Sequence, residues 1–269
     1  MTATVARDHA RVAYEAFAPF YDPFTAHHDY ERWTATLETL ARASGLRGHR
    51  LLDVACGTGK SFLPFLDRGY HVTACDASPS MVALAAAKAP DRARLEVHDM
   101  RALPTLGTFD FVCCLDDALN YLLTTSELTA ALTGLRRNLA PDGVIVFDTN
   151  SVSAYRTFFA SITVVAESDH VMIWEGHAAP SFSAGDAAEA SFETLVRDAN
   201  GTWQRALSVH HQRHHPRVAV EAALRAAGLR GVGIYGMKID GSVTDGFCEA
   251  ENSKAVYVAR HRDADWTAP

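Results

Sequence analysis

The sequence predicts an α/β fold built on a mostly parallel sheet of seven strands. Between residues 50 and 147, short apolar runs alternate with segments of helical periodicity, which is typical of a parallel sheet with helices on both faces. Two further strand-like runs, at 233–239 and 255–259, follow a last helix at 218–227. The 269 residues are 48% hydrophobic and 21% charged, a composition that suits a globular protein with a sizeable core.

The order of elements in the first half of the chain follows from periodicity and from helix-end residues. Residues 8–44 are predicted to be helical with a break at Pro19 and Pro23, because proline donates no backbone hydrogen bond. Strands are expected at 50–55, 71–75, 94–98, 109–115 and 144–147. Helices are expected between them at 60–67, 78–89 and 126–139. The helix at 78–89 has Ser78 as its N-cap and Pro79 in its first turn.

The alternation of strands and helices stops after residue 150, which indicates an inserted unit. Extended stretches follow at 162–167, 171–175, 190–197 and 203–211. Asn200-Gly201, between the last two, is a strong hairpin signal. We therefore expect 151–215 to form an antiparallel substrate cap, inserted between the fifth strand and the last helix. Residues 1–47 would form a helical lid, and 48–150 with 216–262 the ligand-binding core.

Charge and cysteine content narrow the class of protein. A net charge of −7 without runs of like charge argues against a nucleic-acid partner. Residues 1–10 lack the apolar core of a signal peptide, and no apolar run approaches the roughly 20 residues that span a bilayer. Five cysteines without paired CxxC spacing predict free thiols in a cytoplasmic protein and no zinc site. A monomer and a homodimer are both compatible with the sequence.

The glycine turn after the first predicted strand carries most of the information about function. Gly57 and Gly59 permit a positive φ and a close approach of a ligand to the backbone. A dinucleotide-binding turn would have a third glycine at position 62, where this chain has Phe62. Asp53 would repel a phosphate but attract an ammonium, and Asp76 at the end of the second strand suits two ribose hydroxyls. S-adenosylmethionine has an amine and a ribose but no phosphate.

These motifs resemble those of class I S-adenosylmethionine-dependent methyltransferases, whose fold is Rossmann-like. The segment 53–59 is similar to the first motif, Asp76 to the second, and Asp99 to the acid of the third, which faces the adenine amino group. The resemblance implies S-adenosyl-L-methionine as cofactor and S-adenosyl-L-homocysteine as product. The cofactor-binding residues expected are Tyr14, Tyr21, Trp33, Asp53, Ala55, Gly57, Gly59, Asp76, Ala77, Met81, Asp99, Met100 and Leu115.

Aromatic residues ahead of the first strand resemble the lid of small-molecule methyltransferases. By that resemblance, Tyr21 lies beside the sulfonium and Trp33 donates its N–H to the cofactor carboxylate. The antiparallel insertion, ending in a histidine-rich strand at 210–213, is similar to that of bacterial sugar N,N-dimethyltransferases of natural-product pathways. The resemblance implies a small-molecule acceptor in secondary metabolism, methylated by in-line displacement. An amine nitrogen is the first candidate atom, with an electron-rich ring carbon, such as that of an indole, or a hydroxyl as alternatives. A non-catalytic cofactor-binding regulator and a nucleotide-dependent oxidoreductase are rival hypotheses.

Four residues are candidates for catalysis: Asp117, His211, His28 and Tyr21. Asp117 follows the fourth strand at the sheet edge where ligands bind, so it could orient or deprotonate the acceptor. His28, beside His27, lies in a segment that could fold over the cofactor, and imidazole titrates near neutral pH.

The remaining acceptor-side candidates lie after the fourth strand and in the insertion. His211 and Arg213 share one face of the last extended stretch, and His210 and Gln212 share the other. The substrate residues expected are Asp117, Tyr121, Trp174, Glu175, His211 and Arg213; Trp174-Glu175 pairs an aromatic ring with an acid, which suits an amine. No metal is expected, although four residues could imitate part of the acid set of metal-dependent enzymes: Asp116, Asp117, Asp148 and Asn150.

Overall fold

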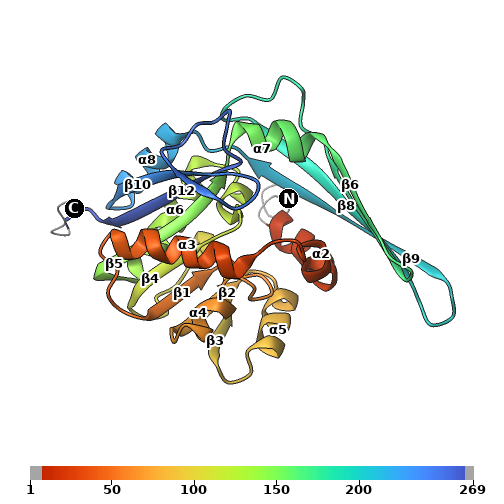
Figure 1. Ribbon diagram of the computed structural model, residues 1–269, viewed down its shortest axis with the longest axis horizontal. Helices are drawn as coiled ribbons and strands as arrows, with labels where there is room; N and C mark the ends of the chain where they lie inside the picture. The colour runs from red at the N-terminus through yellow and green to blue at the C-terminus, as the bar shows by residue number, and fades with distance from the viewer. Residues whose placement is uncertain (1–7, 264–269) are drawn as a thin grey trace.

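The computed structural model describes residues 8–263 and places them in two sheets (Figure 1). The larger sheet has eight strands in the order β11-β10-β12-β5-β4-β1-β2-β3. Its strands are β1 (Arg50–Val54), β2 (His71–Asp76), β3 (Ala93–Val97), β4 (Phe109–Cys114), β5 (Leu139–Asn150), β10 (Leu229–Met237), β11 (Val243–Asp245) and β12 (Lys254–His261). Strands β1 to β5 are parallel, whereas β12 runs antiparallel to both β5 and β10. The predicted Rossmann-like α/β fold is therefore confirmed.

Helices cover both faces of the larger sheet, as the buried parallel strands require. On one face, α3 (Tyr30–Ala43), α4 (Leu63–Asp67) and α5 (Pro79–Lys88) bury residues such as Leu37, Phe65 and Ala85. On the other, α6 (Thr125–Arg137) and α8 (Arg217–Ala226) bury Leu132 and Leu224. Short 3-10 helices, η1 (Met100–Ala102) and η2 (Ala118–Tyr121), follow β3 and β4 at the carboxyl edge of the sheet. No helix between residues 8 and 263 has the length and apolar character of a membrane span.

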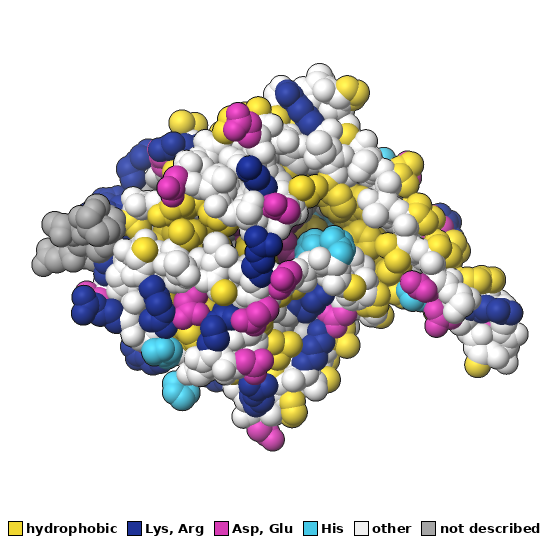
Figure 2. All heavy atoms as spheres, in the orientation of Figure 1, with side chains coloured by type: hydrophobic (Ala, Val, Ile, Leu, Met, Phe, Trp, Pro, Cys, Tyr) yellow, Lys and Arg dark blue, Asp and Glu magenta, His cyan; other side chains and the backbone are white. Residues whose placement is uncertain are grey.

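The insertion forms a separate antiparallel sheet, β6-β7-β8-β9, preceded by α7 (Val152–Thr157) and η3 (Phe158–Ala160). Its strands are β6 (Ile162–Ala166), β7 (His170–Gly176), β8 (Ala187–Arg197) and β9 (Trp203–Arg213). The first helix, α2 (His9–Phe24), lies between this sheet and α5 (Figure 1). The ring centroids of Phe17 and Phe192 are 4.2 Å apart, so lid and insertion share one aromatic core. Figure 2 shows hydrophobic side chains gathered where the insertion meets the lid, while charged side chains are spread over the larger sheet's side of the molecule.

Several boundaries differ from the sequence-based expectations. Helix α2 passes through Pro19 and Pro23 without the predicted break, because packing against α5 and β9 holds the helical backbone there. The sheet has eight strands rather than seven. The additional strand, β11, is three residues long, and so short a strand has no detectable periodicity.

Candidate active site

The turn after β1 and the end of β2 form one rigid corner at the carboxyl edge of the sheet. Gly57 and Gly59 have φ angles of +53° and +89°, which favour glycine. The backbone N–H of Gly57 donates to Asp76 Oδ2 at 2.9 Å, and that of Ser78 donates to Asp76 Oδ1 at 2.9 Å. Burial raises the pKa of Asp76, an effect that these backbone hydrogen bonds partly oppose. The Asp76 carboxylate is thus fixed beside the glycine turn.

A pocket opens at the carboxyl ends of β1 to β4, with an empty volume of about 920 Å³ that includes open solvent at its mouth. The predicted site residues that line it are Tyr14, Tyr21, Ala55, Gly57, Asp76, Ala77, Asp99, Met100, Leu115 and Tyr121. Tyr14 and Tyr21 come from α2, which therefore forms a wall of the pocket. Asp99 is held at the start of η1 by Arg101, whose backbone N–H donates to Asp99 Oδ1 at 2.8 Å.

Other predicted cofactor residues lie just behind this lining. Asp53 is 1% exposed, and its carboxylate accepts hydrogen bonds from Ser61 Oγ at 2.5 Å and Cys113 Sγ at 3.4 Å. Burial raises the pKa of Asp53 to about 7. A Cβ at Gly59 would lie 2.8 Å from the Phe62 ring, so this glycine serves close packing.

The remaining two predicted cofactor residues outside the lining are Met81 and Trp33. Met81 is fully buried in the first turn of α5, rather than at the pocket wall. Trp33 also packs inside, and its buried Nε1 has no hydrogen-bond partner within residues 8–263.

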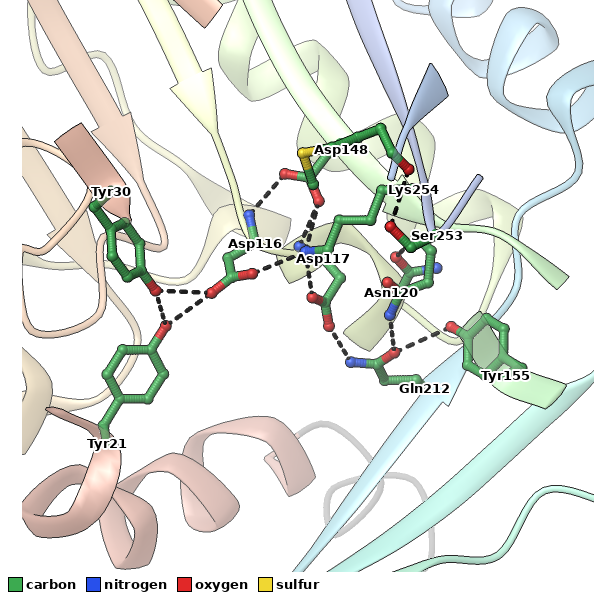
Figure 3. Close-up of polar contacts among 12 residues, drawn as sticks. Tyr21, Tyr30, Asp116, Asp117, Asn120, Asp148, Tyr155, Gln212, Ser253 and Lys254 are labelled. Carbon is green, nitrogen blue, oxygen red and sulfur yellow. Dashed lines mark hydrogen bonds and ion pairs between the residues drawn. The ribbon is translucent and has the colours of Figure 1, made fainter. Parts of the chain in front are cut away.

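At the ends of β4 and β5, three carboxylates surround one ammonium, and we call these residues the Lys254 cluster (Figure 3). Lys254 Nζ lies 2.8 Å from Asp116 Oδ1, 2.7 Å from Asp117 Oδ1 and 3.0 Å from Asp148 Oδ2. Asp148 also accepts the backbone N–H groups of Asp116 at 2.7 Å and Asp117 at 2.9 Å. These bonds hold both residues in the left-handed region, with φ of 59° and 53°.

The lid contacts the Lys254 cluster through two tyrosines. The hydroxyl groups of Tyr21 and Tyr30 each donate to Asp116 Oδ2 at 3.0 Å, and they lie 3.2 Å from each other (Figure 3). Asp116 lines the pocket and keeps 24% of its side chain exposed, whereas Asp148 is fully buried. Asp116 therefore brings the negative charge of the cluster to the pocket wall.

The charges within the Lys254 cluster are unequal. Burial alone would raise the pKa of Asp116, but the Lys254 ammonium and the nearby His28 lower it below its usual value. Burial raises the pKa of Asp117 and of Asp148 despite the same ammonium, since each also faces neighbouring carboxylates. Asp116 is consequently the carboxylate of the cluster that most favours the ionised form.

The insertion contacts the same cluster from the opposite side. Gln212 Nε2 donates to Asp117 Oδ2 at 2.6 Å, and Gln212 Oε1 accepts from Tyr155 at 3.1 Å (Figure 3). The neighbouring His210 is buried and bonded through Nδ1 to the hydroxyl of Tyr121 at 2.8 Å. Burial lowers the pKa of His210 to about 3, so this imidazole is neutral near pH 7.

The structure corrects the predicted placement of several acceptor-side residues. The inward face of β9 carries His210 and Gln212. His211 therefore lies on the other face, outside the pocket lining, with its Nδ1 3.3 Å from Glu189 Oε2. Arg213 instead binds the backbone carbonyls of Gly185 and Leu123. Asp117 is turned toward Lys254 and Gln212 and does not line the pocket.

Three further candidates lie elsewhere than expected. Trp174 is 4% exposed within the core shared by lid and insertion, and Glu175 points to the opposite, exposed face because side chains alternate along a strand. His28 is exposed next to His27, near Asp116 but outside the pocket lining.

The predicted cofactor, catalytic and substrate residues leave out Tyr30, Lys60 and Asp116, which line the pocket, and Lys254, which pairs with Asp116. The sequence suggests Asp116 only as part of an acid set that imitates a metal site. A signal for Lys254 existed, since a lysine that opens an antiparallel last strand must lie near the carboxyl end of the strand beside it. The register pairs Lys254 with Asn150 at the end of β5. Within residues 8–263, no group of three or more histidine, cysteine or acidic side chains has the geometry of a metal site.

The pocket fits a nucleoside that carries an amino acid. The Asp76 carboxylate lies beside the glycine turn. A Cβ added at Gly57 would lie 4.0 Å from the Tyr21 ring, so a side chain at this position would occupy the space between the turn and the lid. Asp99 lies further along the same wall, and Lys60 fixes the lid by donating to the Thr25 carbonyl at 2.9 Å. The pocket therefore runs from the ends of β2 and β3, where Asp76 and Asp99 lie, to Asp116 of the Lys254 cluster.

Comparisons with known proteins agree with this assignment. Residues 51–143 match a methyltransferase-domain family. The chain is 31% identical over 213 residues to dTDP-3-amino-3,6-dideoxy-alpha-D-glucopyranose N,N-dimethyltransferase of Streptomyces fradiae, covering 75% of this chain and 78% of that one. The crystal structure of Streptomyces venezuelae DesVI has a TM-score of 0.72 and 27% identity, covering 91% and 98% of the two chains.

A third similar protein was solved with cofactor bound. S-adenosylmethionine-bound CalS10, an amino pentose methyltransferase from Micromonospora echinaspora, has a TM-score of 0.64 and 25% identity, covering 87% of this chain and 92% of that one. The corner at Gly57 and Asp76, together with these similarities, shows that the chain belongs to the class I S-adenosylmethionine-dependent methyltransferases and uses S-adenosyl-L-methionine as its cofactor.

Proposed function

We propose that this enzyme methylates an amine nitrogen of a small molecule, with an amino sugar as the first class to test. The observation that carries the proposal is the Asp116 carboxylate at the pocket wall, beyond the glycine turn and Asp76. An anion held by two tyrosine hydroxyls and an ammonium suits an acceptor that carries or develops positive charge on nitrogen. Similar proteins named as amino-sugar N,N-dimethyltransferases support this acceptor class.

The chain's residues contribute mainly by alignment and by charge. Bound S-adenosylmethionine would supply an activated methyl group, to whose carbon the acceptor lone pair forms a bond in line as the carbon–sulfur bond breaks and S-adenosylhomocysteine leaves. Asp116 would accept a hydrogen bond from the amine and stabilise the positive charge that grows on nitrogen, while Tyr14, Tyr21 and Tyr30 cover the pocket. Trp33, with its unpartnered buried N–H, remains our proposed donor to the cofactor carboxylate.

The three parts of the chain would then divide the work. Residues 1–47 would act as the lid, 48–150 with 216–262 as the cofactor core, and 151–215 as the cap on the acceptor side. We place the reaction in the cytoplasm within secondary metabolism, and the cysteines agree with a reducing compartment. All five are free thiols: Cys56, Cys75, Cys113, Cys114 and Cys248.

The test is methyl transfer from labelled S-adenosylmethionine to a panel of amino sugars, other primary amines, indoles and phenols. We expect transfer to amines, and Asp116→Asn should lower kcat/KM for the amine about 100-fold while cofactor affinity changes little. Transfer to indoles or phenols alone would overturn the proposal, and so would an Asp116→Asn variant with full activity on the amine.

A further inference from the structure

Lys254 contacts all three carboxylates at the ends of β4 and β5. It opens β12 and lies opposite Asn150 in the antiparallel register, so its side chain reaches the carboxyl edge of the parallel strands. Its side chain is 13% exposed, and its ammonium lies 2.7–3.0 Å from oxygens of Asp116, Asp117 and Asp148. The Trp33 ring centroid lies 5.8 Å from the same nitrogen.

Each carboxylate that binds Lys254 is also bonded to a different part of the molecule (Figure 3). Asp148 fixes the backbone of the β4 turn, Asp117 binds Gln212 of the insertion, and Asp116 binds Tyr21 and Tyr30 of the lid. The ammonium is therefore the common point at which core, insertion and lid meet. Lys254 is thus connected to the lid through Asp116.

The Lys254 ammonium is the main partner that favours an ionised Asp116. Three carboxylates in a buried space repel one another, and burial disfavours each charged form. Lys254 is the cation in direct contact with them, while His28 and Lys60 act on Asp116 from further away. Loss of the ammonium would remove the strongest of the interactions that lower the pKa of Asp116, so this carboxyl group would be protonated more readily and would accept weaker hydrogen bonds from the two tyrosine hydroxyls.

We infer that Lys254 is a positioning residue for methyl transfer, which acts through Asp116 by holding this carboxylate ionised and turned toward the lid at the pocket wall. The inference rests on the proposed role of Asp116 toward the acceptor. Burial of an ion pair is not needed for stability, because well-packed apolar groups of similar volume are often as stable. A functional role for the lysine therefore explains this cluster of four charged groups better than a stabilising role does.

The test is a double-mutant cycle in the full-length enzyme with Lys254→Met, Asp116→Asn and the double variant. We expect Lys254→Met to lower acceptor kcat/KM about 30-fold, with the calorimetric affinity for S-adenosylhomocysteine changed by less than about threefold. In the Asp116→Asn background, Lys254→Met should cost less than about threefold more, because both changes remove the same anion. Lys238→Met, at an exposed position beyond β10, is the matched control and should retain full activity.

Additive losses in the cycle would overturn the inference, and so would a Lys254→Met variant with unchanged acceptor kinetics. If Lys254→Met fails to fold, Lys254→Met/Asp117→Asn removes one charge of each sign and should fold while keeping the acceptor defect; full activity in that variant would also count against the inference. Lys254→Arg should restore part of the activity. If the wild type methylates no amine, the proposed function fails separately, and the same cycle on whichever acceptor is methylated decides the role of Lys254.

Discussion

The two halves of the pocket are assembled in different ways. On the cofactor side, Gly57 and Asp76 are 19 residues apart and belong to one strand-helix-strand unit. On the acceptor side, Asp116 is 95 residues from Tyr21 and 138 from Lys254. The cofactor half is therefore a property of local sequence, whereas the acceptor half exists only once lid, core and insertion are docked.

Charge is also handled differently in the two halves. Asp53, behind the cofactor turn, is buried with the neutral donors Ser61 and Cys113, so its pKa is raised to about 7. Asp116 on the acceptor side is paired with Lys254, and its pKa is lowered. A buried carboxylate without a cation can remain protonated, while one with a cation is available as an anion.

The strongest test of this comparison is removal of Asp76. Asp76→Ala deletes the proposed ribose acceptor and the group that binds the N–H of Gly57 and Ser78, so affinity for S-adenosylhomocysteine should fall about 100-fold or more by calorimetry. Asp110→Ala, at the far end of β4 beside Arg50, is the control and should bind normally. Near-normal binding by Asp76→Ala would show that the turn alone holds the cofactor.

A smaller effect is expected on the acceptor side from Tyr30→Phe. This change deletes one hydrogen bond to the Asp116 carboxylate, a contact to a charged group worth about 1.5–3 kcal/mol, and should lower acceptor kcat/KM about tenfold. Tyr70→Phe removes a comparable bond to Glu38 outside the pocket, so its kinetics should match the wild type. Equal losses in cofactor affinity and acceptor kinetics would mean that the two halves are not separable.

The smallest effect concerns the pH dependence of stability. The pKa of Asp53 is raised to about 7 in the folded state. Its protonation therefore contributes fully to the unfolding free energy below about pH 4, and this contribution is lost as the pH rises toward 7. Asp53→Asn should therefore gain about 2–3 kcal/mol in unfolding free energy relative to wild type between pH 5 and pH 8, measured by urea unfolding without cofactor.

Asp110→Asn provides the control for this pH series. The Arg50 guanidinium lowers the pKa of Asp110, so Asp110 titrates below the pH range tested. The difference in unfolding free energy between Asp110→Asn and wild type should therefore stay the same across that range. If the difference in unfolding free energy between Asp53→Asn and wild type stayed constant from pH 5 to pH 8, Asp53 would be ionised in the folded protein throughout that range.

The residues that could be predicted from the sequence lie mostly in the cofactor half of the pocket. The glycine turn, Asp76 and Asp99 could be located because glycine conformations and strand ends leave local signals. The alternation of side chains predicts the two faces of β9, but docking onto α2 decides which face turns inward, so the sequence alone does not separate His210 from His211. No local pattern distinguishes Asp116 from Asp117, because two consecutive left-handed residues direct the two carboxylates differently.

Helix α2 includes Pro19 and Pro23, and neither residue has a backbone N–H to donate. The carbonyls of Glu15 and Pro19 thus lack the usual i+4 partner in the turn that carries Tyr21. That turn is held to the core by tertiary contacts, namely Tyr21 with Asp116 and Asp22 with Thr58. If this end of the helix moves aside for the demethylated cofactor to leave, the contact between Tyr21 and Asp116 must break, whereas Phe17 can stay packed on the insertion. Product release and acceptor binding would then depend on the same carboxylate.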